Sequence, residues 1–262
     1  MDSDGQVTGD AAVVYEEFFV PALFAEWAPR VATLARIARG SRVLDVACGT
    51  GVLAREAARL AGAGAVVGLD VNPGMLAVAR RIEPGIDWRT GRAEELPFDS
   101  GSFDVVVSQF GLMFFADQTR ALDEMWRVLR PGGTLVTAVW ARLEDTPGYA
   151  KMVELLRRLF GSDIADELRA PFSLGEPSVL RAVFDKSAVT TPRVETVAGT
   201  ARFASIADWV RTDIRGWTLA DKLDDDQFRV LAREAEIALA EFRHEGGVTF
   251  ASPAHLVLST KP

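Results

Sequence analysis

Short apolar segments alternate with helical segments between residues 41 and 140, and this alternation constrains the fold more than any other feature. The segments typical of strands are Ser41–Ala47, Ala65–Asp70, Ile86–Thr90, Phe103–Gln109 and Thr134–Trp140. The segments between them predict helices over Val52–Ala61, from Pro73 to about Arg81, and from about Gln118 to Leu129. Strands that are apolar on both faces and alternate with helices indicate a parallel sheet covered on both sides. In such sheets a ligand binds beyond the carboxyl ends of the strands.

The flanking segments predict a single α/β domain over residues 1–262 with three parts. Residues 1–40 form a helical cap, in which Ala11–Ala38 reads as two amphipathic helices broken near Pro21 or Pro29. Residues 41–140 form the ligand-binding core. Residues 141–262 form a substrate-side region, with a helical insertion at about 205–245 before the last strand. Its predicted helices are Gly148–Phe160, Glu176–Phe184, Ile206–Arg215 and Asp224–Arg243, and its predicted strands are Val194–Thr200 and Ala254–Thr260.

Composition excludes several classes of function. The net charge of −8 repels nucleic acids, and no cluster of Lys and Arg offsets it. A single cysteine, Cys48, excludes an internal disulfide and a cysteine-based zinc site, and no metal site is expected. No apolar run is long enough to span a bilayer, and the polar, acidic first ten residues are unlike a signal peptide. We therefore expect a cytoplasmic protein with no stable membrane insertion.

The stretch "VLDVACGTG" (Val43–Gly51) ends a predicted strand in a glycine-rich turn, and a second acid, Asp70, follows at the end of the next strand. Gly49 and Gly51 let the backbone turn tightly and let a ligand approach without a Cβ in the way. A carboxylate placed like Asp70 accepts two hydrogen bonds from a ribose diol. This pattern predicts a nucleoside-containing ligand across the first two strands.

The class of nucleoside ligand stays open at this point. Residues Gly49–Ala54 formally satisfy the dinucleotide pattern G-x-G-x-x-G/A, which favours a nicotinamide-dependent oxidoreductase. Asp45, just before the turn, suits a ligand with a cationic amine and repels a pyrophosphate. An alternative role for Asp45 is to cap backbone amides of the turn.

Four segments resemble the motifs of class I S-adenosylmethionine-dependent methyltransferases, in their order and in their spacing. They are "VLDVACGTG", "GLDVNPGMLAVAR", "GRAEELPFDSGSFDVVVSQFGLMFFAD" and "ALDEMWRVLRPGGTLV". The resemblance covers about Tyr15 to Trp140 and is greatest to the bacterial ubiquinone/menaquinone-biosynthesis-like group of small-molecule methyltransferases. It implies a Rossmann-like, mostly parallel seven-stranded sheet with helices on both faces, and S-adenosyl-L-methionine as cofactor.

The resemblance also implies roles for individual residues. Asp45, Ala47, Cys48, Gly49 and Gly51 lie around the methionine part of the cofactor, and Asp70 holds the ribose hydroxyls. The residues implied at the adenine are Val71, Met75, Ala93 and Glu94. The residues implied near the methyl donor are Gln109 and Phe110, with Tyr15 covering the cofactor.

One position departs from the family pattern. Arg92 stands where the family often has an aspartate, and an arginine cannot accept the adenine amino hydrogen bond. Glu94 or backbone carbonyls would have to take that role.

The resemblance implies methyl transfer by in-line displacement to a small, largely apolar acceptor. The N-terminal helices and the insertion would form a lid over it, and Trp209 and Trp217 would either line an apolar pocket or anchor the insertion to the sheet. A base is needed only if the acceptor must lose a proton, and the candidates are Tyr15, Glu16 and His244. An alternative is a methyltransferase-fold protein that binds the cofactor and performs other chemistry, such as cyclisation. A monomer or a homodimer fits the sequence equally well.

Overall fold

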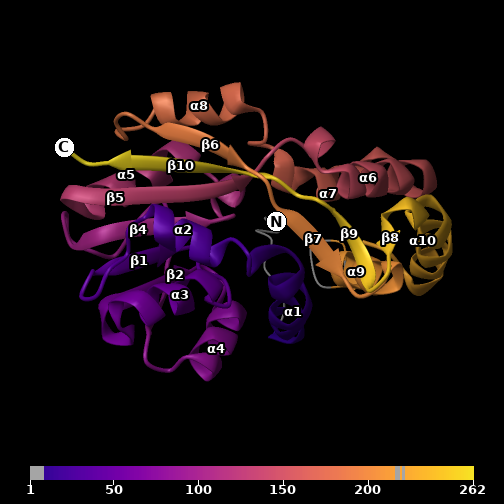
Figure 1. Ribbon diagram of the computed structural model, residues 1–262, viewed down its shortest axis with the longest axis horizontal. Helices are drawn as coiled ribbons and strands as arrows, with labels where there is room; N and C mark the ends of the chain where they lie inside the picture. The colour runs from indigo at the N-terminus through magenta and orange to yellow at the C-terminus, as the bar shows by residue number, and fades with distance from the viewer. Residues whose placement is uncertain (1–8, 216–218, 220–221) are drawn as a thin grey trace.

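A computed structural model describes residues 9–215, 219 and 222–262 of the chain. Its main sheet has seven strands in the order β3-β2-β1-β4-β5-β10-β6 (Figure 1). The strands β1 to β6 span, in order, Val43–Val46, Val66–Asp70, Asp87–Thr90, Phe103–Gln109, Leu129–Trp140 and Arg193–Val197. β10 (Ala254–Thr260) lies between β5 and β6 and runs antiparallel to both, whereas β1 to β5 pair in parallel. The predicted mostly parallel seven-stranded sheet is confirmed.

Helices cover both faces of this sheet, and local sequence signals set their ends. α3 (Val52–Ala61) begins after Gly51 and ends at Gly62, both of which have positive φ. α4 (Pro73–Ile82) is capped by Asn72, whose side chain accepts hydrogen bonds from the amides of Gly74 and Met75. α5 (Gln118–Val128) and α8 (Pro177–Asp185) pack against each other.

The N-terminal cap breaks at one of the two predicted positions, and part of it is a π-helix that was not predicted. It consists of α1 (Gly9–Val14), the π-helix η1 (Tyr15–Phe24) and α2 (Ala28–Leu34). Of the two predicted positions, Pro21 lies inside η1 and does not break it. The wider turns of a π-helix accommodate a proline that an α-helix would exclude. The break falls instead just before Pro29, which occupies the first turn of α2.

A second lobe lies beyond the carboxyl ends of the parallel strands (Figure 1). Its helices α6, α7, α9 and α10 span Pro147–Phe160, Ser162–Arg169, Ile206–Arg215 and Asp225–Ala238. A three-stranded antiparallel sheet joins them, with the order β7-β9-β8 over Thr200–Phe203, Gly247–Ala251 and Arg243–His244.

This lobe corrects two predictions. The helix predicted to reach Arg243 ends at Ala238, and the end of the predicted helical insertion forms β8, which pairs with β9 in a small sheet that was not predicted. The β8–β9 turn depends on Gly246 and Gly247, both at positive φ, and strands of two to five residues leave too short a pattern to recognise. Trp217, one of the two predicted lid tryptophans, lies outside the described residues.

Candidate functional site

The predicted ligand-binding residues gather at the carboxyl edge of the main sheet, where β1, β2 and β4 end side by side. This edge faces the second lobe, and α1 lies beside it (Figure 1). β1 is the central strand of the three, so the turn that follows it lies between the ends of β2 and β4. The edge therefore brings together segments that are far apart in the sequence.

The turn after β1 has the backbone conformation that its glycines predict. Gly49 and Gly51 have φ values of 56° and 90°, in the left-handed region. Ala47 also has a positive φ, 58°, which is rare for a residue with a side chain and is found preferentially at functional sites. The turn leads into the N-terminus of α3, whose unpaired amides favour a negatively polarised ligand group.

Asp70, at the end of β2, connects this turn to the start of α4. Its Oδ2 accepts a hydrogen bond from the Gly49 amide at 2.8 Å, and its Oδ1 accepts one from the Asn72 amide at 2.8 Å. Burial raises the pKa of Asp70, and the amides of Asn72, Gly49 and Val71 oppose that rise by stabilising the charged form. Each oxygen keeps a lone pair that a ribose hydroxyl could use.

Asp45, in β1, is 1% exposed, and its two carboxylate oxygens have no hydrogen-bond partner among the described residues. Burial raises the pKa of Asp45 well above its usual value, the Ala54 amide of α3 opposes that rise, and the charge of Asp70 adds to it. The amide of Ala54, in the first turn of α3, is the kind of partner that the alternative capping role requires. A buried, unpaired carboxylate is costly, and a cationic ligand group would remove that cost.

Tyr15, the first residue of η1, lies directly over the glycine turn. Its ring and hydroxyl would be 3.8 and 3.9 Å from a Cβ built on Gly49. Burial raises the pKa of Tyr15, and the charges of Asp70, Glu16 and Asp45 raise it further. Cys48 is buried in the same turn, and burial also raises the pKa of its thiol, so this cysteine stays a neutral thiol.

The residues implied at the adenine lie on two sides of the edge. Met75 is buried in a small apolar cluster with Val78 of α4 and Ala12 of α1, whereas Val71 is 37% exposed. Ala93 is buried in the main core. Glu94 Oε1 accepts hydrogen bonds from the amides of Ala116 and Asp117 at 2.9 and 3.5 Å, which ties it to the loop before α5.

Phe110, just after β4, belongs to an aromatic cluster, which we define as Tyr15, Phe24, Trp27, Phe110 and Trp140. Gln109, the last residue of β4, lies beside it. Phe110 stacks on Trp140 with ring centroids 3.8 Å apart, and Tyr15 stacks on Phe24 at 5.3 Å. The Gln109 amide donates to the Phe24 carbonyl at 3.2 Å, and its Oε1 is buried with no partner among the described residues. Phe110 has a positive φ of 57°, so the ends of β1 and β4 are both strained.

Two residues that the sequence did not single out also shape the turn. Arg55 of α3 contacts both the turn and the N-terminal cap, and Trp88 of β3 lies against Gly51 and Gly68. Glu16 is distant in sequence from Arg55, and Gly51 and Gly68 are distant from Trp88, so no local pattern could have identified these contacts.

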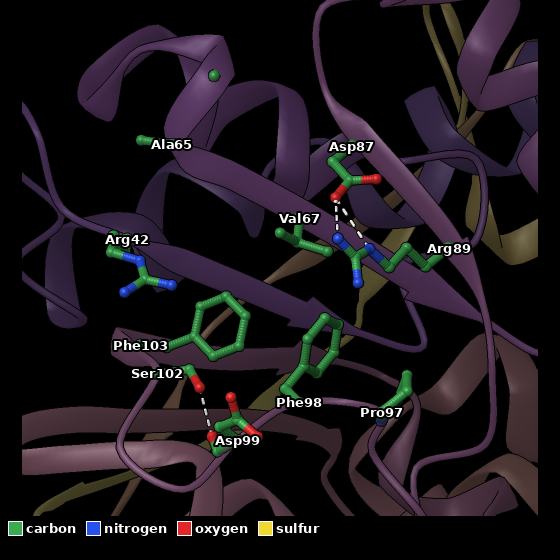
Figure 2. Close-up of a pocket in the computed structure, with 11 residues that line it drawn as sticks. Arg42, Ala65, Val67, Asp87, Arg89, Pro97, Phe98, Asp99, Ser102 and Phe103 are labelled. Atoms are coloured by element: carbon green, nitrogen blue, oxygen red, sulfur yellow. Dashed lines mark hydrogen bonds and ion pairs between the residues drawn. The ribbon is translucent and has the colours of Figure 1, made fainter.

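A separate pocket of about 430 Å³ opens at the opposite edge of the sheet, near the amino ends of β1 to β4. Figure 2 shows Arg89 paired with Asp87, and Phe98 beside Phe103. Arg42 and Arg89 lie over the rings of Phe103 and Phe98, at 5.8 and 5.2 Å from the ring centroids. None of the residues predicted to bind a ligand lines this pocket.

Within the described ranges there is no group of three or more His, Cys, Asp or Glu side chains that could hold a metal ion. No helix in the same part of the chain has the length and apolar character to cross a membrane.

Comparison with known sequences matches residues 44–137 to a family described as a methyltransferase domain. The demethylmenaquinone methyltransferase of Chlorobaculum tepidum is 47% identical over 95 residues, covering 36% of this chain and 39% of that protein. The ubiquinone/menaquinone biosynthesis C-methyltransferase UbiE of Xanthomonas oryzae pv. oryzae is 40% identical over 154 residues, covering 52% of this chain and 60% of that protein. The matches thus span less than two thirds of these relatives' own lengths.

Solved structures share the fold at low sequence identity. The YcgJ protein of Bacillus subtilis superposes with a TM-score of 0.62 at 19% identity, covering 90% of this chain and 98% of that one. The phosphoethanolamine N-methyltransferase 2 of Haemonchus contortus, solved with S-adenosyl-L-methionine, gives a TM-score of 0.62 at 19% identity. The superposition covers 97% of this chain and 57% of that one. The matched residues, the named relatives and the strand order agree: residues 44–137 are similar to a methyltransferase domain and to the ubiquinone/menaquinone methyltransferases, and the chain has the Rossmann-like class I methyltransferase fold.

Proposed function

We propose that this protein binds S-adenosyl-L-methionine at the carboxyl edge of its main sheet and catalyses transfer of its methyl group to a small molecule. The observation that carries the proposal is the set of buried carboxylates around the glycine turn. Asp45 offers two oxygens without partners, and Asp70 has already been oriented by two backbone amides.

These residues fit the two ends of the proposed cofactor. A cationic amino-acid tail suits the unpaired Asp45, whereas a pyrophosphate would be repelled by it. The ribose diol suits the remaining lone pairs of Asp70, and the absent side chain of Gly49 leaves space between the turn and Tyr15. The adenine side would be formed by Val71 and Met75, with Ala93 and Glu94 further along the edge.

When bound, S-adenosyl-L-methionine supplies an electrophilic methyl group. The protein's contribution is then mainly to orient donor and acceptor for in-line displacement, which lowers the barrier without acid–base chemistry. Tyr15 covers the turn and helps to exclude water. Because its pKa is raised, its phenol stays protonated at neutral pH and is a poor general base. Glu16 is paired with Arg55, and His244 lies on β8 in the second lobe.

The acceptor would bind between this edge and the second lobe, against the aromatic cluster. The rings of this cluster make that part of the edge apolar, which favours an apolar acceptor. The relatives named for demethylmenaquinone and ubiquinone/menaquinone support a small-molecule acceptor of that general kind. The net charge of −8 argues against a nucleic-acid partner. The protein would act in the bacterial cytoplasm, as a monomer or a homodimer.

Transfer of a labelled methyl group tests this proposal. The purified protein would be incubated with S-adenosyl-L-methionine carrying an isotopic label on its methyl group, together with a bacterial metabolite extract. We expect label in at least one small organic product and none when the Gly49→Val variant replaces the wild type. Binding of the cofactor without any label transfer would instead favour the alternative of cyclisation, for which one solved structure of this fold, the [4+2]-cyclase SpnF, is a precedent at a TM-score of 0.50.

A further inference from the structure

We propose that Arg55 is a positioning residue that fastens the π-helix η1 over the glycine turn and thereby slows release of the bound cofactor. The proposal rests on the function proposed above, because it concerns the same cofactor site.

Arg55 lies in the first turn of α3 and contacts two segments at once. Its Nη1 donates to the Thr50 carbonyl of the glycine turn at 2.6 Å, and its Nη2 donates to Glu16 Oε1 of η1 at 2.7 Å. A guanidinium suits this position, because its planar fork serves two acceptors in a fixed geometry. We call this arrangement the Glu16–Arg55–Thr50 bridge.

The bridge fixes the residue next to Glu16, which is Tyr15. Tyr15 lies over Gly49, between the turn and the aromatic cluster, so the position of η1 determines whether the turn is covered. A ligand on the turn would have to leave past Tyr15. Breaking the bridge would therefore loosen the cover without removing any group that touches the ligand.

Burial makes this ion pair more than a surface contact. The side chains of Arg55 and Glu16 are 22% and 19% exposed, and Glu16 Oε2 is buried without a partner among the described residues. Loss of Arg55 would leave a largely buried carboxylate with no cation beside it, which is unfavourable. By contrast, Arg59, one turn later on α3, is 67% exposed and pairs with Glu56 of its own helix.

The test measures S-adenosylhomocysteine binding to the full chain by calorimetry and its dissociation by stopped-flow fluorescence. Arg55→Ala should raise the Kd by roughly tenfold, a factor that corresponds to about 1.4 kcal/mol, with most of the change in the dissociation rate. Glu16→Gln should act in the same direction from the other side of the bridge, without altering α3. Arg55→Lys should recover part of the affinity, and Arg59→Ala should match the wild type.

Hydrogen exchange separates this role from general stabilisation. In the wild type the bound ligand should slow amide exchange over residues 15–24, and in Arg55→Ala that protection should be largely lost while β1 to β5 keep theirs. The Arg55→Ala, Glu16→Gln double variant should bind about as weakly as the weaker single variant, because both remove one interaction. If the wild type binds S-adenosylhomocysteine and both single variants bind and release it as the wild type does, the bridge has no such role. If the wild type fails to bind it, the proposed function itself is overturned.

Discussion

Asp70 orders the local backbone and at the same time presents acceptors to a ligand. Both of its oxygens accept backbone amides, one from the turn after β1 and one from the start of α4. We expect Asp70→Ala to weaken S-adenosylhomocysteine binding by about 1–3 kcal/mol, the cost of leaving polar partners unpaired. Isothermal calorimetry would measure this loss. Asp70→Asn keeps the shape of the side chain and loses its charge, so its affinity for S-adenosylhomocysteine should lie between those of the wild type and Asp70→Ala.

The matched control is Asp99→Ala, because Asp99 is an exposed acid at the opposite edge of the sheet. It should bind as the wild type does. An affinity that Asp70→Ala leaves unchanged would contradict the ribose role.

Gly68 of β2 is glycine because Trp88 of the neighbouring strand lies against it. A Cβ on Gly68 would come within 2.4 Å of two ring atoms of Trp88. We expect Gly68→Ala to lower the free energy of unfolding by about 1–3 kcal/mol through overpacking, as measured by urea denaturation. Unlike Gly51, Gly68 does not have a positive φ, so the close contact alone would cause the loss.

The partner substitution Trp88→Leu should remove that penalty. Combined with Trp88→Leu, the Gly68→Ala change should cost clearly less than it does in the wild type, since its close neighbour is gone. Strictly additive losses would show that the ring is not the source of the effect.

The residues that the sequence identified correctly share one property: their surroundings are set by neighbours close in the chain. Gly49 and Gly51 form the predicted tight turn, with positive φ values, and Asn72 caps α4 as its place before Pro73 predicts. Arg55 and Trp88 could not be found this way. Glu16 is 39 residues from Arg55, and only the folded chain brings them together.

At the scale of elements, a buried acid joins two helices of the second lobe. Asp213 of α9 is 2% exposed and accepts hydrogen bonds from Tyr149 Oη of α6 at 3.1 Å and from Trp209 Nε1 at 2.6 Å. Burial raises the pKa of Asp213 to about 7, although the two hydrogen bonds oppose the rise. The folded protein therefore binds a proton here more tightly than the unfolded chain, in which an aspartate has a pKa of about 3.9.

This difference predicts how stability depends on pH. Between about pH 4 and pH 7 the folded state holds more protons at Asp213, so this residue's contribution to the free energy of unfolding falls as the pH rises. Asp213→Asn removes the titration. The stability of the variant relative to the wild type should therefore increase with pH across this window, by up to about 1.4 kcal/mol per unit. Urea denaturation at several pH values would measure it, and a difference that stays constant with pH would contradict the assignment.

Elements of seven or more residues with a clear apolar pattern were predicted well. Elements that are very short, or whose form depends on contacts between distant segments, were predicted poorly. α3, β4, α9 and β10 have the predicted bounds. The π-helix around Pro21 and the small sheet of β7, β8 and β9 were not predicted. η1 lies against β7 and α9, so its unusual form depends on packing between distant segments.

At the scale of the whole molecule, the core and the second lobe enclose the candidate site from two sides, and the N-terminal cap connects them. Glu26, between η1 and α2, accepts a hydrogen bond from the Thr200 amide of β7, and Arg30 of α2 donates to the Ala198 carbonyl. The fold class followed from the alternating pattern of residues 41–140. The acceptor did not, because the second lobe carries no motif of known chemistry.

The central claim is that the edge of the main sheet binds a nucleoside with a cationic amino-acid tail. Calorimetric titration of the purified protein with S-adenosylhomocysteine and, separately, with NADH tests it most directly. The account predicts saturable binding of about one S-adenosylhomocysteine per chain and no measurable binding of NADH. Binding of NADH together with no heat from S-adenosylhomocysteine would contradict it.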